Sequence, residues 1–183
     1  MKCSKTLITT AILGFSLASF HSTAWADTPK QQFQQGYEAS VRGDYQTAFK
    51  LWLPLAEQGN VSAQFNLGLM YQKGEGVKQD YFEAVKWYRQ AAEQGEANAQ
   101  FILGNMYLSG RGVKQDSFGA VKWFRQAAEQ GHAKAQFILG GLYLLGEGVQ
   151  VNKSLAKEWL GKACDNGVQE GCEYYGKLNK GEL

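Results

Sequence analysis

The sequence predicts an all-α fold, specifically an α-solenoid of stacked antiparallel helix pairs. Three observations support this prediction. Marker residues recur every 36 positions, apolar residues within each unit follow helical spacing, and helix-capping residues stand in register at the unit boundaries. Because one helix pair cannot bury its apolar faces alone, successive pairs are expected to stack on one another.

Two glycine series define the repeat. One series ends the units, and the other falls inside a predicted helix of each unit: Gly59, Gly95, Gly131 and Gly167; Gly68, Gly104, Gly140 and Gly176. Ala84 and Trp87 each begin a further series with the same step. A glycine inside a helix costs ~1 kcal/mol relative to alanine. We therefore expect the Gly68 series to mark positions where a neighbouring backbone approaches closely.

Each unit contains two stretches with helical periodicity. In the first, Ala63, Leu67 and Met70 fall on one helix face, and in the second, Ala84 and Trp87 belong to a wider apolar stripe. The predicted helices cover residues 31–42, 45–58, 61–73, 81–94, 97–109, 117–130, 133–145, 153–166 and 168–179.

The predicted helix ends carry suitable capping residues. The second helices should begin after side chains that favour the N-cap position: Asp44, Asp80, Asp116 and Asn152. Glu83, three residues after Asp80, suggests a capping box. Glycines should end both helices of a unit, with Gly74, Gly110 and Gly146 after the first helices and Gly59, Gly95 and Gly131 after the second.

The first 26 residues are predicted to be a secretory signal peptide. Lys2 and Lys5 precede an apolar run from 7 to 20, and Ala24-Trp25-Ala26 is a small-x-small cleavage pattern. The apolar run is shorter than the ~20 residues that a membrane-spanning helix needs, which favours cleavage over an anchor. The helical repeat domain is then 27–183, with units of about 31–58, 59–94, 95–130 and 131–166 and a C-terminal half-unit 167–179.

Charge argues against several classes of partner. Without residues 1–26, the chain carries equal numbers of basic and acidic residues and no block of Lys or Arg, so nucleic acid is not an expected partner. No second segment is long and apolar enough to span a membrane after signal cleavage. We expect a monomer that binds protein or peptide partners and uses no cofactor and no metal.

The repeated elements Ala-Glu-Gln-Gly, Leu-Gly-x-x-Tyr, Gly-x-Gly-Val and Ala-Val-Lys-Trp resemble the Sel-like repeat (SLR) family, a branch of the tetratricopeptide-type solenoids. The resemblance covers about residues 59–176, with a more tetratricopeptide-like unit ahead of it at Gly36-Tyr37 and Gly43-Asp44. It implies a right-handed superhelix and adaptor or scaffold roles in complex assembly, signalling, envelope processes and host contact.

Cys164 and Cys172 have the C-x7-C spacing of exported cysteine-rich members of this family, in which each such pair forms a disulfide across a helix–helix turn. Cys164 occupies the register position of Ala128, and Cys172 that of Gln136. The resemblance therefore implies a Cys164–Cys172 disulfide, which suits an oxidising compartment. The alternative is a pair of buried, reduced thiols.

An enzymatic alternative also follows from the resemblance, since some cysteine-rich members bind or slowly hydrolyse β-lactams. Ser154 and Lys157 spell S-x-x-K, the acylating motif of serine β-lactamases, but no S-D-N or K-T-G partner motif is present. We therefore interpret the motif as chance and expect no catalytic residues. His132 has no neighbouring ligand or nucleophile in the mature sequence and is interpreted as a solvated turn residue. The tryptophans stand at core spacing and are interpreted as packing residues.

Positions that the repeat leaves free are the candidate binding residues, because the fold does not require them. On the predicted first helices these are Asn66, Leu69, Lys73, Ile102, Asn105, Ser109, Ile138, Gly141 and Leu145. In tetratricopeptide-type solenoids the first helices line the concave surface, so these residues could form a groove for an extended peptide or a helix. The alternative is that they are tolerated surface substitutions.

These observations together predict an exported protein-binding scaffold or adaptor in the cell envelope, with the periplasm as the expected compartment. The alternatives are a β-lactam-binding or weak β-lactamase-type enzyme and a secreted, extracellular host-interaction factor.

Overall fold

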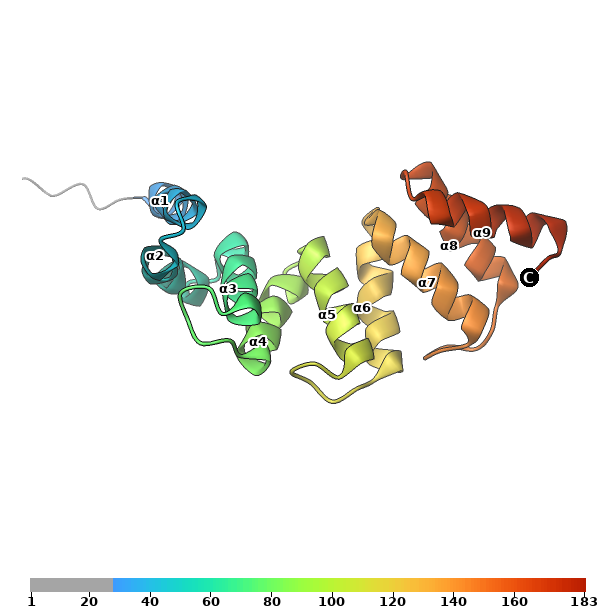
Figure 1. The fold of residues 1–183 in the computed structure, drawn as a ribbon, viewed down its shortest axis with the longest axis horizontal. Helices are drawn as coiled ribbons and strands as arrows, with labels where there is room; N and C mark the ends of the chain where they lie inside the picture. The colour runs from blue at the N-terminus through green and yellow to red at the C-terminus, as the bar shows by residue number, and fades with distance from the viewer. Residues whose placement is uncertain (1–27) are drawn as a thin grey trace, which may run out of the picture.

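The computed structural model describes residues 28–183, and this part of the chain forms nine α-helices and no strands (Figure 1). The helices are α1 (Pro29–Val41), α2 (Tyr45–Glu57), α3 (Val61–Lys73), α4 (Tyr81–Glu93), α5 (Ala97–Ser109), α6 (Ser117–Glu129), α7 (Ala133–Leu145), α8 (Lys153–Asp165) and α9 (Gln169–Lys180). Every extensive helix–helix contact joins consecutive helices, so the predicted all-α solenoid is confirmed. The predicted signal peptide lies outside the described residues.

The predicted helix boundaries agree with the structure to within two residues. The start of α1 differs most, at Pro29 rather than residue 31. Thr28 and Gln31 form a capping box here, in which the Gln31 N–H donates to Thr28 Oγ1 at 3.3 Å and the Thr28 N–H donates to Gln31 Oε1 at 2.9 Å. Proline suits the first helical position because its missing N–H would have no helical partner there.

The predicted caps of the second helices are present, with one correction. The side chains of Asp44, Asp80, Asp116 and Asn152 each accept a backbone N–H of the helix that follows. The capping box expected at Asp80 is incomplete, because Glu83 pairs with Lys86 at 3.2 Å. The Asp80 N–H donates instead to the Tyr71 carbonyl at 2.9 Å. The Asp80 side chain therefore caps α4, but the Glu83 side chain does not accept the Asp80 N–H in return.

Gly68 and Gly104 make room for side chains, not for a neighbouring backbone as the sequence suggested. A Cβ on Gly140 would meet both the Leu160 side chain and, at 3.2 Å, the Ala156 carbonyl oxygen, and one on Gly176 would meet nothing within 4 Å. A Cβ on Gly68 would lie 2.6 Å from the ring of Tyr88, and one on Gly104 would lie 2.7 Å from the ring of Phe124. Real Cβ atoms do not approach neighbours so closely. The second helix of each unit therefore inserts a large side chain against the bare backbone of the first helix.

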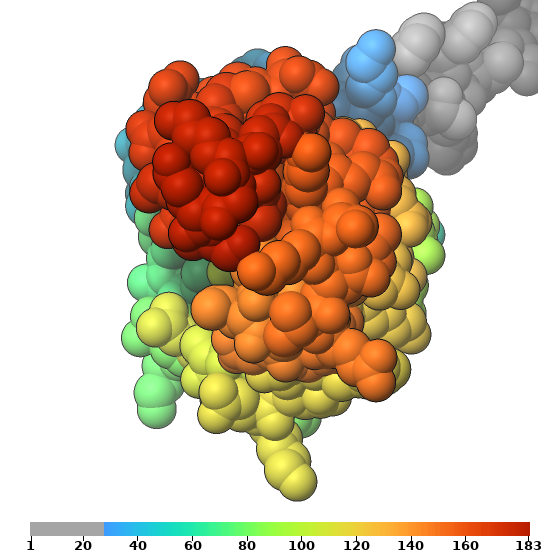
Figure 2. Space-filling view, turned by 90° about the vertical axis from the view of Figure 1, so that its right-hand side faces the viewer, coloured from blue at the N-terminus to red at the C-terminus, as the bar shows by residue number. Residues whose placement is uncertain are grey.

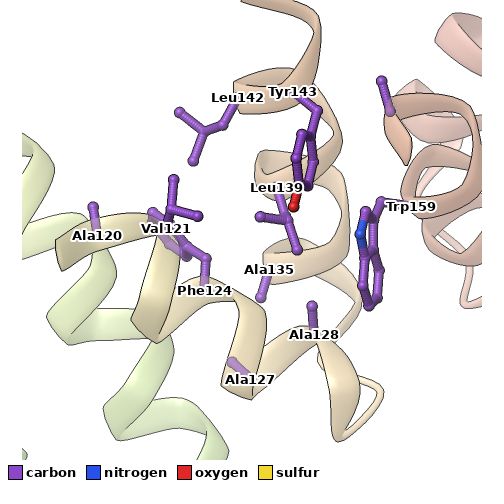
Figure 3. Close-up of a cluster of buried hydrophobic side chains, with 11 residues drawn as sticks. Ala120, Val121, Phe124, Ala127, Ala128, Ala135, Leu139, Leu142, Tyr143 and Trp159 are labelled. Atoms are coloured by element: carbon purple, nitrogen blue, oxygen red, sulfur yellow. The ribbon is translucent and has the colours of Figure 1, made fainter. Parts of the chain in front are cut away.

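Large buried side chains from three consecutive helices form each part of the core. Figure 3 shows one such cluster, in which Phe124 of α6, Leu139 of α7 and Trp159 of α8 converge. Trp87 and Trp123 occupy the same register position as Trp159, and all three are less than one-tenth exposed. Their predicted packing role is confirmed.

Buried glutamines tie successive units together. Gln64, Gln100 and Gln136 each donate a side-chain N–H at 3.0 Å to the carbonyl eight residues earlier, at Ala56, Ala92 and Ala128. Each also accepts a hydrogen bond from an amide side chain thirty residues later, at Gln94, Gln130 and Asn166. Buried amides require such partners, so these bonds fix the packing of neighbouring units.

A disulfide replaces this glutamine contact at the last helix turn. Cys172 stands at the register position of Gln136, and Cys164 stands at that of Ala128. The structure joins the two cysteines across the α8–α9 turn, with their Cα atoms 4.5 Å apart. Figure 2, viewed toward the C-terminal end, shows α9 (red) lying on the end of the stack.

Candidate functional site

A first hollow lies between α1, α2 and α3 and contains three of the predicted binding residues. Asn66, Leu69 and Lys73 line it from α3, together with Ser40, Val41, Tyr45, Trp52, Met70 and Glu75. Its volume is about 240 Å³. The Lys73 ammonium lies 3.6 Å from a Glu75 carboxylate oxygen at the rim. This hollow therefore combines an apolar interior with amide and charged groups of both signs.

A second hollow, of about 190 Å³, lies between α7, α8 and α9. It contains the predicted residues Ile138, Gly141 and Leu145, together with Phe137, Leu144, Leu160 and Tyr174. Apart from the Tyr174 hydroxyl, these side chains are apolar, and the Leu145 side chain is 76% exposed. A pocket of this composition can accept an apolar side chain of a partner.

The predicted residues of α5 line neither hollow. The Asn105 side chain donates to the Phe101 carbonyl at 2.9 Å, and the Ser109 hydroxyl donates to the Asn105 carbonyl at 2.9 Å. Both therefore use hydrogen-bonding capacity within their own helix, as Asn66 of α3 also does by donating a side-chain N–H to the Ser62 carbonyl at 2.9 Å. Ile102 packs against the buried cluster that includes Leu103. The first-helix candidates thus divide into two hollows on either side of α5.

The S-x-x-K motif does not form a reactive pair. Ser154 and Lys157 lie on the exposed first turns of α8. The Lys157 ammonium lies 5.7 Å from the centre of the Tyr175 ring. A serine nucleophile requires a base within hydrogen-bonding reach and a pocket for the acyl group. Among the described residues, Ser154 makes no hydrogen bond to Lys157, whose ammonium lies over the Tyr175 ring instead.

His132 has a more specific role than the solvated turn residue that the sequence suggested. It is the N-cap of α7, and its Nδ1 accepts the Ala135 N–H at 3.2 Å. Its ring stacks on Phe101 with the ring centres 4.5 Å apart. Burial lowers the pKa of His132 below its ordinary value of 6.5. The ring therefore contributes packing as well as capping.

Within residues 28–183, no group of three His, Cys, Asp or Glu side chains is arranged to hold a metal ion. The helices of this same range include none with the length and apolar character needed to cross a bilayer.

The family model of the Sel1 repeat matches four consecutive segments of the chain, residues 33–60, 61–96, 97–132 and 133–168. The last three segments begin at the first residues of α3, α5 and α7. They end at the N-cap residues of α5, α7 and α9. No curated protein matches the sequence significantly.

Two solved structures combine substantial sequence identity with a similar fold. A protective antigen present in uropathogenic Escherichia coli strains, which displays an SLR fold, is 40% identical with a TM-score of 0.79, over 85% of this chain and 34% of that one. A Sel1 repeat protein from Oxalobacter formigenes is 38% identical with a TM-score of 0.75, over 79% and 59%. The present chain thus matches about a third and about three fifths of the lengths of these two proteins.

The cysteine-rich protein B of Helicobacter pylori has a TM-score of 0.55 and 20% identity, over 81% of this chain and 98% of that protein. At this identity the likeness concerns the fold alone.

Proposed function

Because the chain belongs to the Sel1 repeat family, we propose that it is an exported scaffold that binds partner proteins or peptides in the hollows of its first helices. Sel1 repeat proteins generally mediate protein interactions. The observation that carries the proposal for this chain is the position of its variable first-helix residues. Two sets, one on α3 and one on α7, line hollows of suitable size for partner side chains.

The two hollows differ in chemistry, which defines the kind of partner segment. The hollow at α7 offers Ile138 and Leu145 to an apolar anchor. The hollow at α3 offers Leu69 as an apolar contact, with Asn66 and Lys73 beside it for backbone carbonyls or a carboxylate. A segment that places an apolar side chain at α7 and a polar one at α3 would fit both.

Substitutions taken from the repeat itself test this assignment. Asn105 and Ser109 of α5 occupy the register positions of Leu69 and Leu145. The substitutions Leu69→Asn and Leu145→Ser therefore introduce residue types that the repeat already uses at these positions. The helix tolerates these residues there, so folding should be retained. A photoreactive amino acid at position 144 should cross-link to partners in intact cells, and the double variant should lose most adducts because both anchors are weakened.

The matched control places the same photoreactive group at position 57, an exposed position of α2 that lines neither the first-helix hollows nor the hollows at α4 and α6. Adducts that are equally abundant at 57 and 144, or that persist in the double variant, would contradict binding in the first-helix hollows. Far-ultraviolet circular dichroism of the purified variant checks that helix content is unchanged.

Export is part of the proposal. The signal-peptide pattern of residues 1–26 and the Cys164–Cys172 disulfide support it, since disulfides persist in oxidising compartments. A second candidate, a factor that acts outside the cell, is favoured by the likeness to the protective antigen of uropathogenic Escherichia coli. Fractionation into cytoplasm, periplasm and medium separates the two, and recovery of the protein with its first 26 residues in the cytoplasm would contradict both.

A further inference from the structure

Two phenylalanines occupy the same position in neighbouring units and face solvent. Phe82, in the first turn of α4, is 70% exposed, and Phe118, in the first turn of α6, is 73% exposed. The equivalent residues of α2 and α8 are Gln46 and Ser154. The fold therefore does not require an aromatic residue here, and the exposure of two large apolar side chains points to an interaction.

Phe82 lines a hollow between α4 and the loop that precedes α6. Phe118 lines a similar hollow between α6 and the loop that precedes α8. The hollow at α4 has a volume of about 410 Å³, and the hollow at α6 has one of about 250 Å³. Valines form the apolar part of each hollow, with Val85 and Val113 beside Phe82, and Val121 and Val149 beside Phe118. We call these two hollows together the aromatic–basic surface.

Basic side chains dominate the polar part of this surface. Lys86, Arg89 and Lys114 line the hollow at α4, and Lys122 and Arg125 line the hollow at α6. Glu93 is the one acidic residue among the lining residues of the two hollows. The whole sequence has 19 basic and 17 acidic residues, so this local excess of positive charge is not a property of the chain as a whole.

The two arginines are held in place. Arg89 Nη2 donates to the Tyr107 hydroxyl at 2.8 Å, and Arg125 Nη2 donates to the Tyr143 hydroxyl at 2.7 Å. A guanidinium has five N–H donors, so one hydrogen bond orients it and leaves others for a carboxylate. The cost of ordering this side chain is therefore reduced before a partner binds.

The pattern is confined to the two middle units. In α8, Glu158 and Gly161 stand where α6 has Lys122 and Arg125. The lysine of α4 pairs with Glu83, whereas the equivalent residue of α6 is Gly119, so Lys122 has no such carboxylate beside it. The absence of the pattern from α8 shows that solenoid packing does not demand it.

We propose that the aromatic–basic surface binds an extended, acidic protein segment in which an apolar side chain stands beside each carboxylate. The apolar side chain packs between the phenylalanine and the two valines of a hollow, and the carboxylate pairs with the neighbouring arginine and lysine. Two equivalent hollows in adjacent units bind two such pairs of one segment, which raises the overall affinity. This surface lies on the second helices and does not rest on the first-helix hollows of the proposed function.

Fluorescence anisotropy with synthetic peptides tests the proposal on the full mature chain. The probe is a labelled peptide of Glu-Leu pairs separated by Gly-Ser spacers, and the comparison peptide has Gln in place of each Glu. The Glu peptide should bind at least about tenfold more tightly than the Gln peptide, because charge-assisted bonds to Arg89 and Arg125 are lost with Gln. Added salt should weaken the binding of the Glu peptide.

The decisive variant is Phe82→Gln combined with Phe118→Ser, which uses the residues found at the same register in α2 and α8. It should weaken binding of the Glu peptide by at least about tenfold, as expected for loss of two apolar anchors. Lys122→Glu, which introduces the residue of α8, should weaken it as well. Leu145→Ser, in the first-helix hollow at α7, should leave it unchanged.

Several results would overturn the proposal. These are equal binding of the Glu and Gln peptides, full binding by the Phe82→Gln/Phe118→Ser variant despite unaltered circular dichroism, or loss of binding with Leu145→Ser alone. Tighter binding of a single-stranded oligonucleotide than of the peptide would assign the surface to nucleic acid instead. A wild-type dimer in sedimentation velocity that dissociates in the double phenylalanine variant would assign it to a second copy of the chain.

Discussion

At the scale of single residues, the intrahelical glycines set how closely the two helices of a unit approach. Phe124 is fully buried against Gly104, so its ring has no room to withdraw from an added methyl group. Gly176 occupies the same register position in α9, where a Cβ would meet nothing within 4 Å. The same residue type therefore has opposite energetic consequences at the two positions.

We predict that Gly104→Ala lowers the free energy of unfolding by about 1–3 kcal/mol, because it overpacks a closed contact. Gly176→Ala should instead raise the free energy of unfolding by about 0.5–1 kcal/mol, through the better helix propensity of alanine. Urea denaturation measures both. Equal effects at the two positions would show that the ring of Phe124 does not determine the need for Gly104.

His132 links a helix cap to pH. Its neutral Nδ1 accepts the Ala135 N–H, and burial is the main cause of its lowered pKa. The unfolded chain therefore binds a proton more readily than the folded protein does. The stability that His132 contributes is complete above its unfolded pKa of about 6.5 and is lost as the pH falls through the lower folded pKa.

We predict that the wild-type protein loses stability on acidification below about pH 6.5, the ordinary pKa of histidine, more steeply than His132→Asn does. Asparagine supplies the cap that Asn60 provides to α3 but does not titrate. His132→Ala should lower the free energy of unfolding at neutral pH by about 1 kcal/mol through loss of the cap. Chemical denaturation across the pH range measures these effects. An identical pH dependence in the wild type and His132→Asn would contradict the role given to the imidazole.

At the scale of elements, α9 has fewer buried residues than the other helices of residues 28–183 and lacks a side-chain N-cap. Gly171 is its one buried residue, and its N-cap, Val168, makes no side-chain hydrogen bond. The other helices of the described chain each have a side-chain N-cap bond. The disulfide to α8 therefore occurs where the ordinary devices of the repeat are weakest.

We predict that Cys164→Ala with Cys172→Ala lowers the free energy of unfolding by roughly 2.5 kcal/mol, the loop-entropy value for a short disulfide-closed loop. Cys164→Ala with Cys172→Gln should recover about 1 kcal/mol of this loss, because it restores the alanine–glutamine hydrogen bond of the preceding units. Urea denaturation compares the variants, and intact mass should show that reduction adds two hydrogen atoms to the wild type. Equal stability of the two variants would show that the disulfide does not stand in for the glutamine contact.

At the scale of the whole molecule, the solenoid is built from contacts between consecutive helices (Figure 1). Such an architecture separates folding from recognition, because each unit needs only its repeated core and its tie to the next unit. Residues at the remaining positions can vary from unit to unit. This separation allows the first helices to present two dissimilar hollows and the second helices of the middle units to present the aromatic–basic surface.

Much of the fold follows from local signals. Asp116 predicted the start of α6 and Gly110 predicted the end of α5, because capping depends on the few residues around a helix terminus. The partner of Gly104 could not be predicted in this way, since the ring of Phe124 comes from another helix and its position depends on the angle between the two. The role of Gln100 was also missed, although its 36-residue recurrence was a signal that could have identified it.

Within residues 28–183, the sequence alone determined the number and order of the helices, the N-caps of the second helices and the residues that the repeat leaves free. Periodicity and capping are short-range properties that a single chain displays directly. The tertiary structure decided what surrounds the free residues. It placed Asn66 and Lys73 of α3 in one hollow with Val41 of α1, placed Ile138 and Leu145 of α7 in another with Tyr174 of α9, and brought Phe82 of α4 into a hollow with Val113. These juxtapositions depend on how helices pack across units, a geometry that residue spacing along one helix does not contain.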